Sequence, residues 1–284
     1  MNTIVPGEPF ISFKDVRIGF GENEVLRGIS FDVWPGETKV LLGESGSGKT
    51  LIMKLAAGLL QADSGKIWVM GQNVGEMEED DLLDFRRHVG FVFQEGALFD
   101  SLTVSDNVAF RLREEDFPDA EIDQRVRESL RFVELEQAID KYPDELSGGM
   151  RRRVSIARAL IDKPPLIFYD SPTAGLDPVT SQTIINLILR GRDLQGVTSL
   201  LATHRVQDAF GLAHFRFDQS TNRVLRMDGN GHGSKPVAQG ESQRGAPPTN
   251  VLVLREGAIY FEGAADEVLH SSDDYLKKFL ASAE

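Results

Sequence analysis

The first forty residues contain short apolar runs separated by turn residues. Ile11–Phe13 and Ile29–Val33 alternate between apolar and polar side chains, which is the pattern of a strand with one buried face. Pro35–Gly36 marks a turn, and Val40–Leu42 is a continuous apolar run of the kind found in buried strands. The chain is therefore predicted to begin with β-structure.

Beyond Leu42 the hydrophobic pattern switches repeatedly between the strand and helix periods. We expect strands at Gly65–Met70, Val89–Phe93, Leu166–Tyr169 and Val197–Ala202. We expect helices at Leu51–Leu60, Glu78–His88, Val104–Arg113, Ala120–Leu135, Gly148–Ile161 and Val179–Arg192. Asp106 and Asp119 are candidate helix caps. The alternation predicts an α/β fold with a mainly parallel sheet covered by helices, and a helical subdomain at about residues 95–160.

The last third of the chain includes a segment of different composition. Gln219–Asn250 is rich in Gly, Ser, Asn, Gln and Pro, and we predict that most of it is a flexible surface loop. A tolerated insertion is the simpler interpretation, and a regulatory or partner-docking role is the alternative. A hairpin at Val251–Phe261 and short helices at Ala264–His270 and Asp273–Leu280 should follow. We expect one domain over residues 9–270 and a helical extension over residues 271–284.

The composition excludes several classes of function. The 284 residues are 41% hydrophobic and 26% charged, which is ordinary for a globular protein. Zero cysteines exclude disulfides and thiol chemistry, and a net charge of −13 argues against nucleic acid as the main partner. No apolar run is long enough to span a bilayer, and the first ten residues lack the features of a signal peptide. We therefore expect a cytosolic protein.

A phosphate-binding motif follows the predicted strand at Val40–Leu42. The pattern G-x-x-x-x-G-K-[ST] is matched by Gly43-Glu44-Ser45-Gly46-Ser47-Gly48-Lys49-Thr50. Glycines let backbone N–H groups close around phosphate oxygens, and the helix that begins here directs its positive end at the anion. Lys49 would reach the β- and γ-phosphates, and Thr50 would offer its hydroxyl to Mg²⁺. The sequence therefore predicts a site for ATP with Mg²⁺.

Two further segments suit the same chemistry. The apolar strand Leu166–Tyr169 ends in Asp170, and a carboxylate in that place can join the Mg²⁺ shell. Ser147-Gly148-Gly149 stands just before a predicted helix, where Ser147 can cap and the glycines allow close approach of an anion. Since the chain already has one phosphate loop, we expect this second anion site to face the ATP of another subunit.

Together these motifs resemble the nucleotide-binding domain of an ABC transporter, over nearly the whole chain. The resemblance implies a P-loop NTPase fold with an antiparallel β subdomain and a helical subdomain. It also implies an ATPase that works as a head-to-tail pair, most simply a homodimer, bound to an integral membrane permease. Ser147, Gly148 and Gly149 match the family's signature, so each ATP would lie between one phosphate loop and the other subunit's signature.

The resemblance also assigns roles to single residues. Phe20 matches the aromatic that stacks on adenine, although a plain core or edge aromatic remains an alternative. Gln94 matches the glutamine that contacts Mg²⁺ and water, and His204 matches the histidine at the γ-phosphate. Asp177 ends the segment Ala174–Asp177, which matches the loop along the dimer interface.

A finer resemblance is to the ATPase subunits of Mla/Mce-type phospholipid transporters. It rests on Gly96–Val104, Asn107–Glu114 and Asp274–Leu280. It implies lipid transport between membranes, an Mce-domain partner protein, and a place on the cytoplasmic face of the inner membrane. Residues Gln94–Glu114 would then face the permease. The alternatives are a generic cassette that serves another substrate, and a cassette outside transport.

The chain departs from the family pattern in two places. Ser171 follows Asp170, where the family usually has a glutamate that polarises the attacking water. Either Gln94, His204 and Mg²⁺ support slow hydrolysis, which we favour, or the chain binds ATP with little turnover. The second departure is Met150 followed by Arg151–Arg153, and we expect at least two of these three arginines to lie on a solvated helix face.

Overall fold

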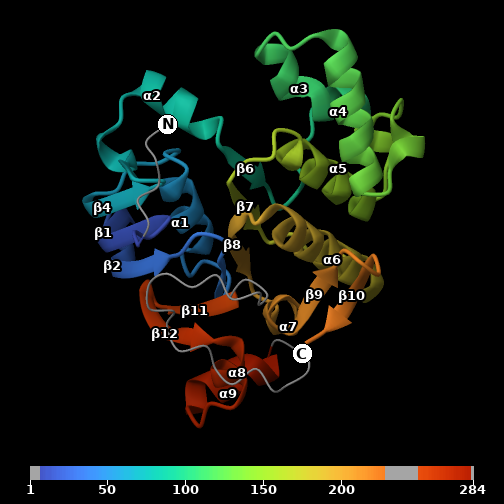
Figure 1. Ribbon diagram of the computed structural model, residues 1–284. Helices are drawn as coiled ribbons and strands as arrows, with labels where there is room; N and C mark the ends of the chain where they lie inside the picture. Colours follow the sequence, from blue (N-terminus) through green and yellow to red (C-terminus); the bar gives the residue numbers. More distant parts are fainter. Residues whose placement is uncertain (1–6, 228–248, 283–284) are drawn as a thin grey trace.

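The computed structural model describes residues 7–227 and 249–282. Its centre is a six-stranded sheet in the order β12-β11-β3-β8-β7-β6, in which all neighbours are parallel except β11 and β12 (Figure 1). The strands are β3 (Thr38–Gly43), β6 (Val89–Val92), β7 (Leu166–Asp170), β8 (Thr198–Thr203), β11 (Thr249–Arg255) and β12 (Ala258–Ala264). The predicted mainly parallel sheet is confirmed.

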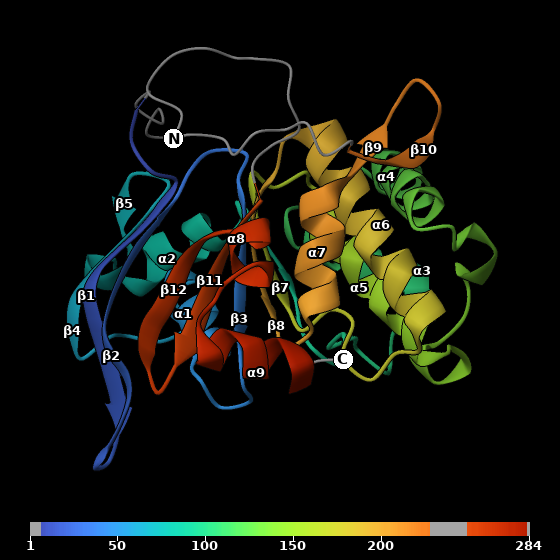
Figure 2. The ribbon, with the colours of Figure 1, turned by 90° about the horizontal axis from the view of Figure 1, so that it is seen from below.

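A second, antiparallel sheet has the order β2-β1-β4-β5. Its strands are β1 (Ile11–Phe20), β2 (Asn23–Val33), β4 (Ser64–Val69) and β5 (Gln72–Asn73). The first two are longer than the sequence predicted, because they pair as far as Phe20 and Asn23 and form a hairpin. This hairpin projects beyond the rest of the sheet (Figure 2). The antiparallel β subdomain implied by the resemblance is therefore present.

Helices lie on both faces of the central sheet. They are α1 (Lys49–Ala56), α2 (Glu79–Arg86), α3 (Val104–Glu114), α4 (Asp119–Phe132), α5 (Gly148–Leu160), α6 (Pro178–Gln195), α7 (Val206–His214), α8 (Ala265–Leu269) and α9 (Asp274–Ser282). Short 3₁₀ turns occur at Val74–Glu76, Glu136–Ala138 and Pro143–Glu145. Helices α3, α4 and α5 gather at one side of the molecule, between β6 and β7 in sequence (Figure 1). Within the described ranges, every helix is too short or too polar to traverse a lipid bilayer.

Both predicted caps are wrong. Thr103 precedes α3 and its hydroxyl accepts a hydrogen bond from the Asp106 backbone N–H at 3.1 Å. The Asp106 carboxylate accepts from the same hydroxyl at 2.7 Å and lies 2.6 Å from Arg113. Asp119 is already the first residue of α4, and Pro118 stands at the cap position. Helix α3 begins at Val104 as expected but has Thr103 as its cap, and α4 begins one residue earlier than expected.

The predicted loop at Gln219–Asn250 is partly wrong. Strand β10 (Arg223–Arg226) lies inside it and pairs with β9 (Phe215–Asp218), and β11 already begins at Thr249. The reason is tertiary, because Asp193 on α6 accepts a hydrogen bond from the Phe217 N–H at 2.6 Å and so fastens the hairpin to the domain. Residues 228–248 of the predicted loop lie outside the described residues.

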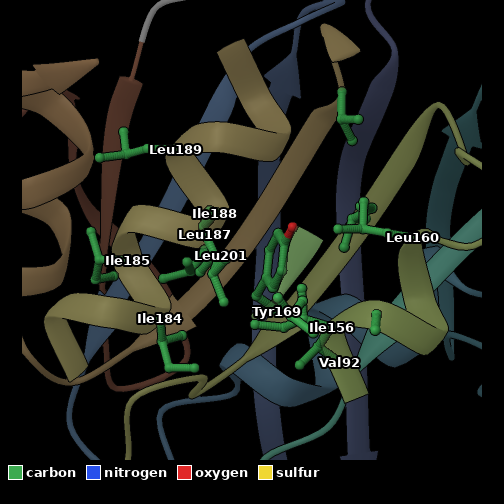
Figure 3. Close-up of a cluster of buried hydrophobic side chains, with 14 of the residues drawn as sticks. Val92, Ile156, Leu160, Tyr169, Ile184, Ile185, Leu187, Ile188, Leu189 and Leu201 are labelled. Carbon is green, nitrogen blue, oxygen red and sulfur yellow. The ribbon is translucent and has the colours of Figure 1, made fainter. Parts of the chain in front are cut away.

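The hydrophobic core has one half on each face of the central sheet. Alternate strand residues point to opposite halves, so Tyr169 and Leu201 belong to one cluster and Phe168 and Leu200 to the other. The first cluster is filled by α5 and α6, and Figure 3 shows Tyr169 between Ile156 and Ile188. The second cluster joins the central sheet to α1 and the antiparallel sheet. The strands of the central sheet are therefore packed between two hydrophobic clusters, which holds their ends in place.

Truncation in the first cluster should lower stability. Ile188→Ala removes a side chain that is 1% exposed, and we expect the free energy of unfolding to fall by about 2–5 kcal/mol. Urea denaturation measures this change, and Ile188→Val is the matched control with an expected loss of about 0.5–1.5 kcal/mol. Equal losses in the two variants would contradict tight packing at this position.

Candidate functional site

The carboxyl ends of β3, β7 and β8 meet at one edge of the central sheet, because these neighbouring strands are parallel. A cavity of about 300 Å³ lies at this edge. The predicted site residues that line it are Ser45, Gly46, Gly48, Lys49, Thr50, Gln94, Ser171 and His204. The fold therefore brings together residues that are distant in sequence, in the region where open α/β sheets bind ligands.

The loop at Gly43–Thr50 wraps around the side chain of its own lysine. The Lys49 ammonium donates hydrogen bonds to the carbonyl oxygens of Gly43 and Glu44, both at 2.8 Å, and to the Ser47 hydroxyl at 3.3 Å. Gly48 has φ 100° and precedes α1 without any side-chain cap. A Cβ at Gly43 would lie 2.7 Å from the Leu254 carbonyl oxygen, so β11 supports the loop from behind.

Burial makes Lys49 unusual among lysines. Only 8% of the residue is exposed. Desolvation lowers its pKa to about 8, against the opposing influence of the Asp170 and Glu44 carboxylates. The first N–H groups of a helix have no partner within the helix, so a buried ammonium beside the start of α1 is well placed to pair with phosphate oxygens.

Thr50 and Asp170 form the part of the site that suits a divalent cation. The Thr50 hydroxyl donates to both carboxylate oxygens of Asp170, at 3.0 and 3.1 Å, and Asp170 is 6% exposed. A hydroxyl beside one carboxylate fits Mg²⁺, which takes one or two protein oxygens and completes its shell with water and phosphate. No cluster of three or more His, Cys, Asp or Glu side chains that could hold a metal ion occurs in residues 7–227 and 249–282.

Ser171 occupies the position at which the sequence resemblance implies a carboxylate. Its backbone φ is 48°, its N–H donates to the Ala202 carbonyl oxygen at 2.8 Å, and its hydroxyl lies 3.4 Å from an Asp170 oxygen. The side chain lines the cavity together with Gln94 and His204. The cavity wall at this position therefore carries a hydroxyl in place of an acid.

Asp208, which the sequence motifs did not indicate, lies four residues after His204 on α7. One of its oxygens accepts hydrogen bonds from Thr173 at 2.6 Å and from Thr203 at 2.7 Å. Burial raises the pKa of this carboxyl. Asp208 thus ties the loop after β7 to the loop that carries His204. A polar residue on the buried face of a helix was the available signal, but its partners are distant in sequence.

The predicted signature lies outside the cavity of its own chain. The Ser147 hydroxyl accepts from the Met150 N–H at 3.2 Å, which confirms it as the cap of α5. Asp177 caps α6 by accepting from the N–H groups of Val179 and Thr180, both at 3.0 Å. A Cβ at Gly149 would lie 2.4 Å from a Thr180 side-chain carbon. The signature thus packs against the first turn of α6, and Asp177 makes no contact with the cavity of its own chain.

Phe20 also lies apart from the cavity. It is 55% exposed and forms the end of the β1–β2 hairpin, opposite Asn23. Val25, further along the same hairpin, does line the cavity. The ring is therefore free to stack on a ligand that extends from the cavity toward the hairpin.

Comparison with known proteins identifies the family. Residues 26–174 match the model of the ABC transporter family. The chain is 36% identical over 214 residues to the spermidine/putrescine import ATP-binding protein PotA of Aggregatibacter actinomycetemcomitans, covering 75% of this chain and 56% of the relative. It is 38% identical over 198 residues to the methionine import ATP-binding protein MetN of Brucella abortus, covering 70% and 54%. The chain thus spans little more than half of these two relatives.

A plant relative covers more of the chain. The protein TRIGALACTOSYLDIACYLGLYCEROL 3, chloroplastic, of Arabidopsis thaliana is 35% identical over 255 residues, which cover 86% of this chain and 72% of the relative. This match extends well beyond the segment matched by the family model.

Solved structures agree with this assignment. The ATP-binding cassette MJ0796, in a dimeric post-hydrolysis state bound to ADP and Pi, has a TM-score of 0.71 and 26% identity, covering 90% of this chain and 98% of that one. CbiO1 of Clostridium perfringens, part of the ABC transporter complex CbiONQ, has a TM-score of 0.74 and 25% identity, covering 93% and 92%. The motifs, the fold and these matches together show that the chain belongs to the ABC transporter family, as one of its ATP-binding cassettes.

Proposed function

We propose that this chain binds MgATP and hydrolyses it to drive a membrane transporter. The observation that carries the proposal is the convergence of Lys49, Thr50, Gln94 and His204 on one cavity, with Asp170 hydrogen-bonded to Thr50. Phosphoryl transfer depends on positioning and charge stabilisation more than on covalent chemistry. These side chains can provide both.

Each of these residues has a role in the proposal. Lys49 and the N–H groups at the start of α1 hold the β- and γ-phosphates. Thr50, Asp170 and Gln94 would hold Mg²⁺, whose charge offsets that of the phosphates when it is bound. Gln94 also orients the attacking water, and His204 donates a hydrogen bond to the γ-phosphate. Phe20 stacks on the adenine.

A second copy of the chain completes the site in this proposal. Ser147–Gly149 lie outside their own chain's cavity, and the N–H groups at the start of α5 suit an anion supplied from elsewhere. Two chains related by a two-fold axis would place each signature on the other's ATP, with Asp177 along the interface. The dimeric state of MJ0796 supports this arrangement.

The proposed cargo is phospholipid, moved between membranes through an integral permease with an Mce-domain partner. The support is the Mla/Mce-like segments together with the plant relative, whose name refers to a galactolipid and whose match covers 86% of this chain. Import of another substrate is the second candidate, favoured by the names of PotA and MetN. In either case the chain would lie on the cytoplasmic face of the membrane, against the permease.

The ATPase proposal is tested by measuring phosphate release from MgATP by the purified chain and by its complex with the permease. We expect steady turnover that disappears when Mg²⁺ is removed by a chelator. Absence of turnover in both preparations would contradict the enzyme and support a cassette that only binds nucleotide.

The cargo is tested by purifying the tagged chain with its membrane partners and identifying them by mass spectrometry. A permease accompanied by an Mce-domain protein supports lipid transport. A permease accompanied by an amino-acid- or polyamine-binding protein contradicts it.

The affinity for ATP should depend on pH through Lys49. Because burial lowers its pKa to about 8, the ammonium loses its proton as the pH rises through that value. We expect constant affinity up to about pH 7 and a progressive loss above about pH 8, by at most tenfold per pH unit. Titration calorimetry with MgATP measures this profile. Lys49→Arg is the control, since arginine stays charged over this range, and identical profiles in the two proteins would contradict the role of Lys49.

A further inference from the structure

At least two of the three consecutive arginines of α5 were expected on a solvated face, and the structure leaves Arg151 and Arg153 partly exposed and buries Arg152. Each donates a hydrogen bond to a backbone carbonyl oxygen: Arg151 to Leu146 at 2.8 Å, Arg152 to Phe93 at 2.7 Å, and Arg153 to Val133 at 3.1 Å. Arg152 is buried, with 6% of its surface exposed. The pattern of charges along the helix did not reveal this, because the acceptors come from three separate segments.

The acceptor of Arg152 belongs to the turn that carries Gln94. The Phe93 carbonyl oxygen also accepts from the Gly96 N–H at 2.9 Å, which closes the turn around Gln94. On the other side, Arg158 donates to the Gly96 carbonyl oxygen at 3.0 Å. Two arginines of the same helix therefore hold the carbonyl groups immediately before and shortly after Gln94.

Removing the guanidinium groups of Arg152 and Arg158 from water has a desolvation cost. Burial lowers the pKa of both Arg152 and Arg158, and the Asp170 and Glu95 carboxylates act in the opposite direction on Arg152. Arg158 also lies over the Phe99 ring, with its guanidinium carbon 5.8 Å from the ring centroid. Even with such partners, a buried charge can destabilise the fold relative to an apolar residue of similar size. The contribution of these two arginines is therefore geometric. Their guanidinium groups fix the position of the turn that carries Gln94.

The same helix connects this turn to the signature. Helix α5 has 13 residues and begins directly after Ser147. Its first turn carries Gly148 and Gly149, and its middle carries Arg152 and Arg158. A helix is a rigid element that can carry coupling between two sites at its surface. Any displacement of its first turn is therefore transmitted to the carbonyl groups that its arginines hold.

We propose that Arg152 and Arg158 are positioning residues that couple Ser147–Gly149 to Gln94 through α5. They set the place of Gln94 in the nucleotide cavity according to the position of the signature helix. This inference rests on the proposed ATPase function and adds to it two residues that touch neither ATP nor the metal.

The test compares Arg152→Gln with Arg153→Gln. The control changes the same residue type at the next position of the same helix, where the guanidinium holds Val133 and Glu134 rather than the Gln94 turn. For Arg152→Gln we expect kcat for ATP hydrolysis to fall by about tenfold or more, because one charged hydrogen bond is lost. The KM for ATP should stay nearly unchanged. Arg152→Lys should restore part of the rate, because lysine still offers a charged donor.

Amide hydrogen exchange gives a second readout that does not need turnover. Peptides that cover residues 93–97 should exchange about tenfold faster in Arg152→Gln and in Arg158→Gln, and at the wild-type rate in Arg153→Gln. Equal effects of Arg152→Gln and Arg153→Gln on kcat and on exchange would overturn the inference.

The two proposals fail in different ways. If the wild-type chain shows no ATP turnover, the proposed ATPase function is contradicted. The amide exchange measurement does not need turnover and still tests the coupling between Ser147–Gly149 and Gln94. If Arg152→Gln fails to fold, Arg152→Lys and Arg158→Lys carry the test, with selective loss of kcat and faster exchange in residues 93–97 as the expected result. Wild-type kcat and exchange in both lysine variants would then contradict a role for the arginine geometry.

Discussion

Replacing Ser171 by glutamate is expected to raise the basal rate of ATP hydrolysis by about 10²–10⁴-fold, the usual contribution of a general base. The position lines the cavity together with Gln94 and His204, so a longer acidic side chain would reach into it. The serine hydroxyl lies 3.4 Å from an Asp170 oxygen and cannot accept a proton as a carboxylate does. The prediction follows from the interpretation that the missing carboxylate limits turnover.

Ser171→Gln is the matched control for this experiment. It has nearly the size and shape of glutamate but lacks the basic carboxylate, so its rate should stay close to that of the wild type. Phosphate release under saturating MgATP is the measurement. A rate that is unchanged or lower in Ser171→Glu, or an equal rise in Ser171→Gln, would show that the missing carboxylate is not the limiting factor.

Lys49→Ala is expected to weaken ATP binding by about ten- to a hundredfold and to reduce hydrolysis to background, because charged hydrogen bonds to the phosphates are lost. The ammonium also holds the carbonyl groups of Gly43 and Glu44. Its removal therefore loosens the loop even before nucleotide arrives. Calorimetric titration with MgATP gives the affinity, and phosphate release gives the rate.

Lys54→Ala provides the control on the same helix. Lys54 lies in the last turn of α1 and outside the lining of the cavity. The ATP affinity and the hydrolysis rate of the Lys54→Ala variant should therefore match those of the wild type. Wild-type affinity in Lys49→Ala would contradict nucleotide binding at this loop. Equal losses in both variants would point to a general disturbance of α1.

Some parts of the fold were predictable because their signals are local. The phosphate loop is contiguous, and its glycines, lysine and threonine specify it without reference to the rest of the chain. The hairpin predicted at Val251–Phe261 is formed by β11 and β12, and its turn residues Glu256 and Gly257 both have positive φ, which is the conformation that tight hairpins require. The cap at Ser147 also depends only on its neighbours in sequence.

Other parts were not predictable because their partners lie far away in sequence. Helix α7 and strands β9 and β10 were missed. The β9–β10 hairpin is fastened by Asp193 through the Phe217 N–H, and α7 contributes Asp208, whose hydrogen-bond donors are Thr173 and Thr203. The pattern of polar and apolar residues in this stretch is weak, so tertiary contacts decide its structure.

The sequence by itself determined the groups on which the proposed chemistry depends: a glycine-rich loop that suits phosphate, an acid at the end of a buried strand, and a capped helix start that we propose as a second anion site. Those features follow from backbone conformation and strand ends, which short motifs encode. Only the tertiary structure decided what holds these groups in place. The sequence did not indicate which of Arg151–Arg153 would be buried, and the structure places Arg152 against the Phe93 carbonyl oxygen. That contact exists because the fold packs α5 against the turn after β6, which no pattern within α5 specifies.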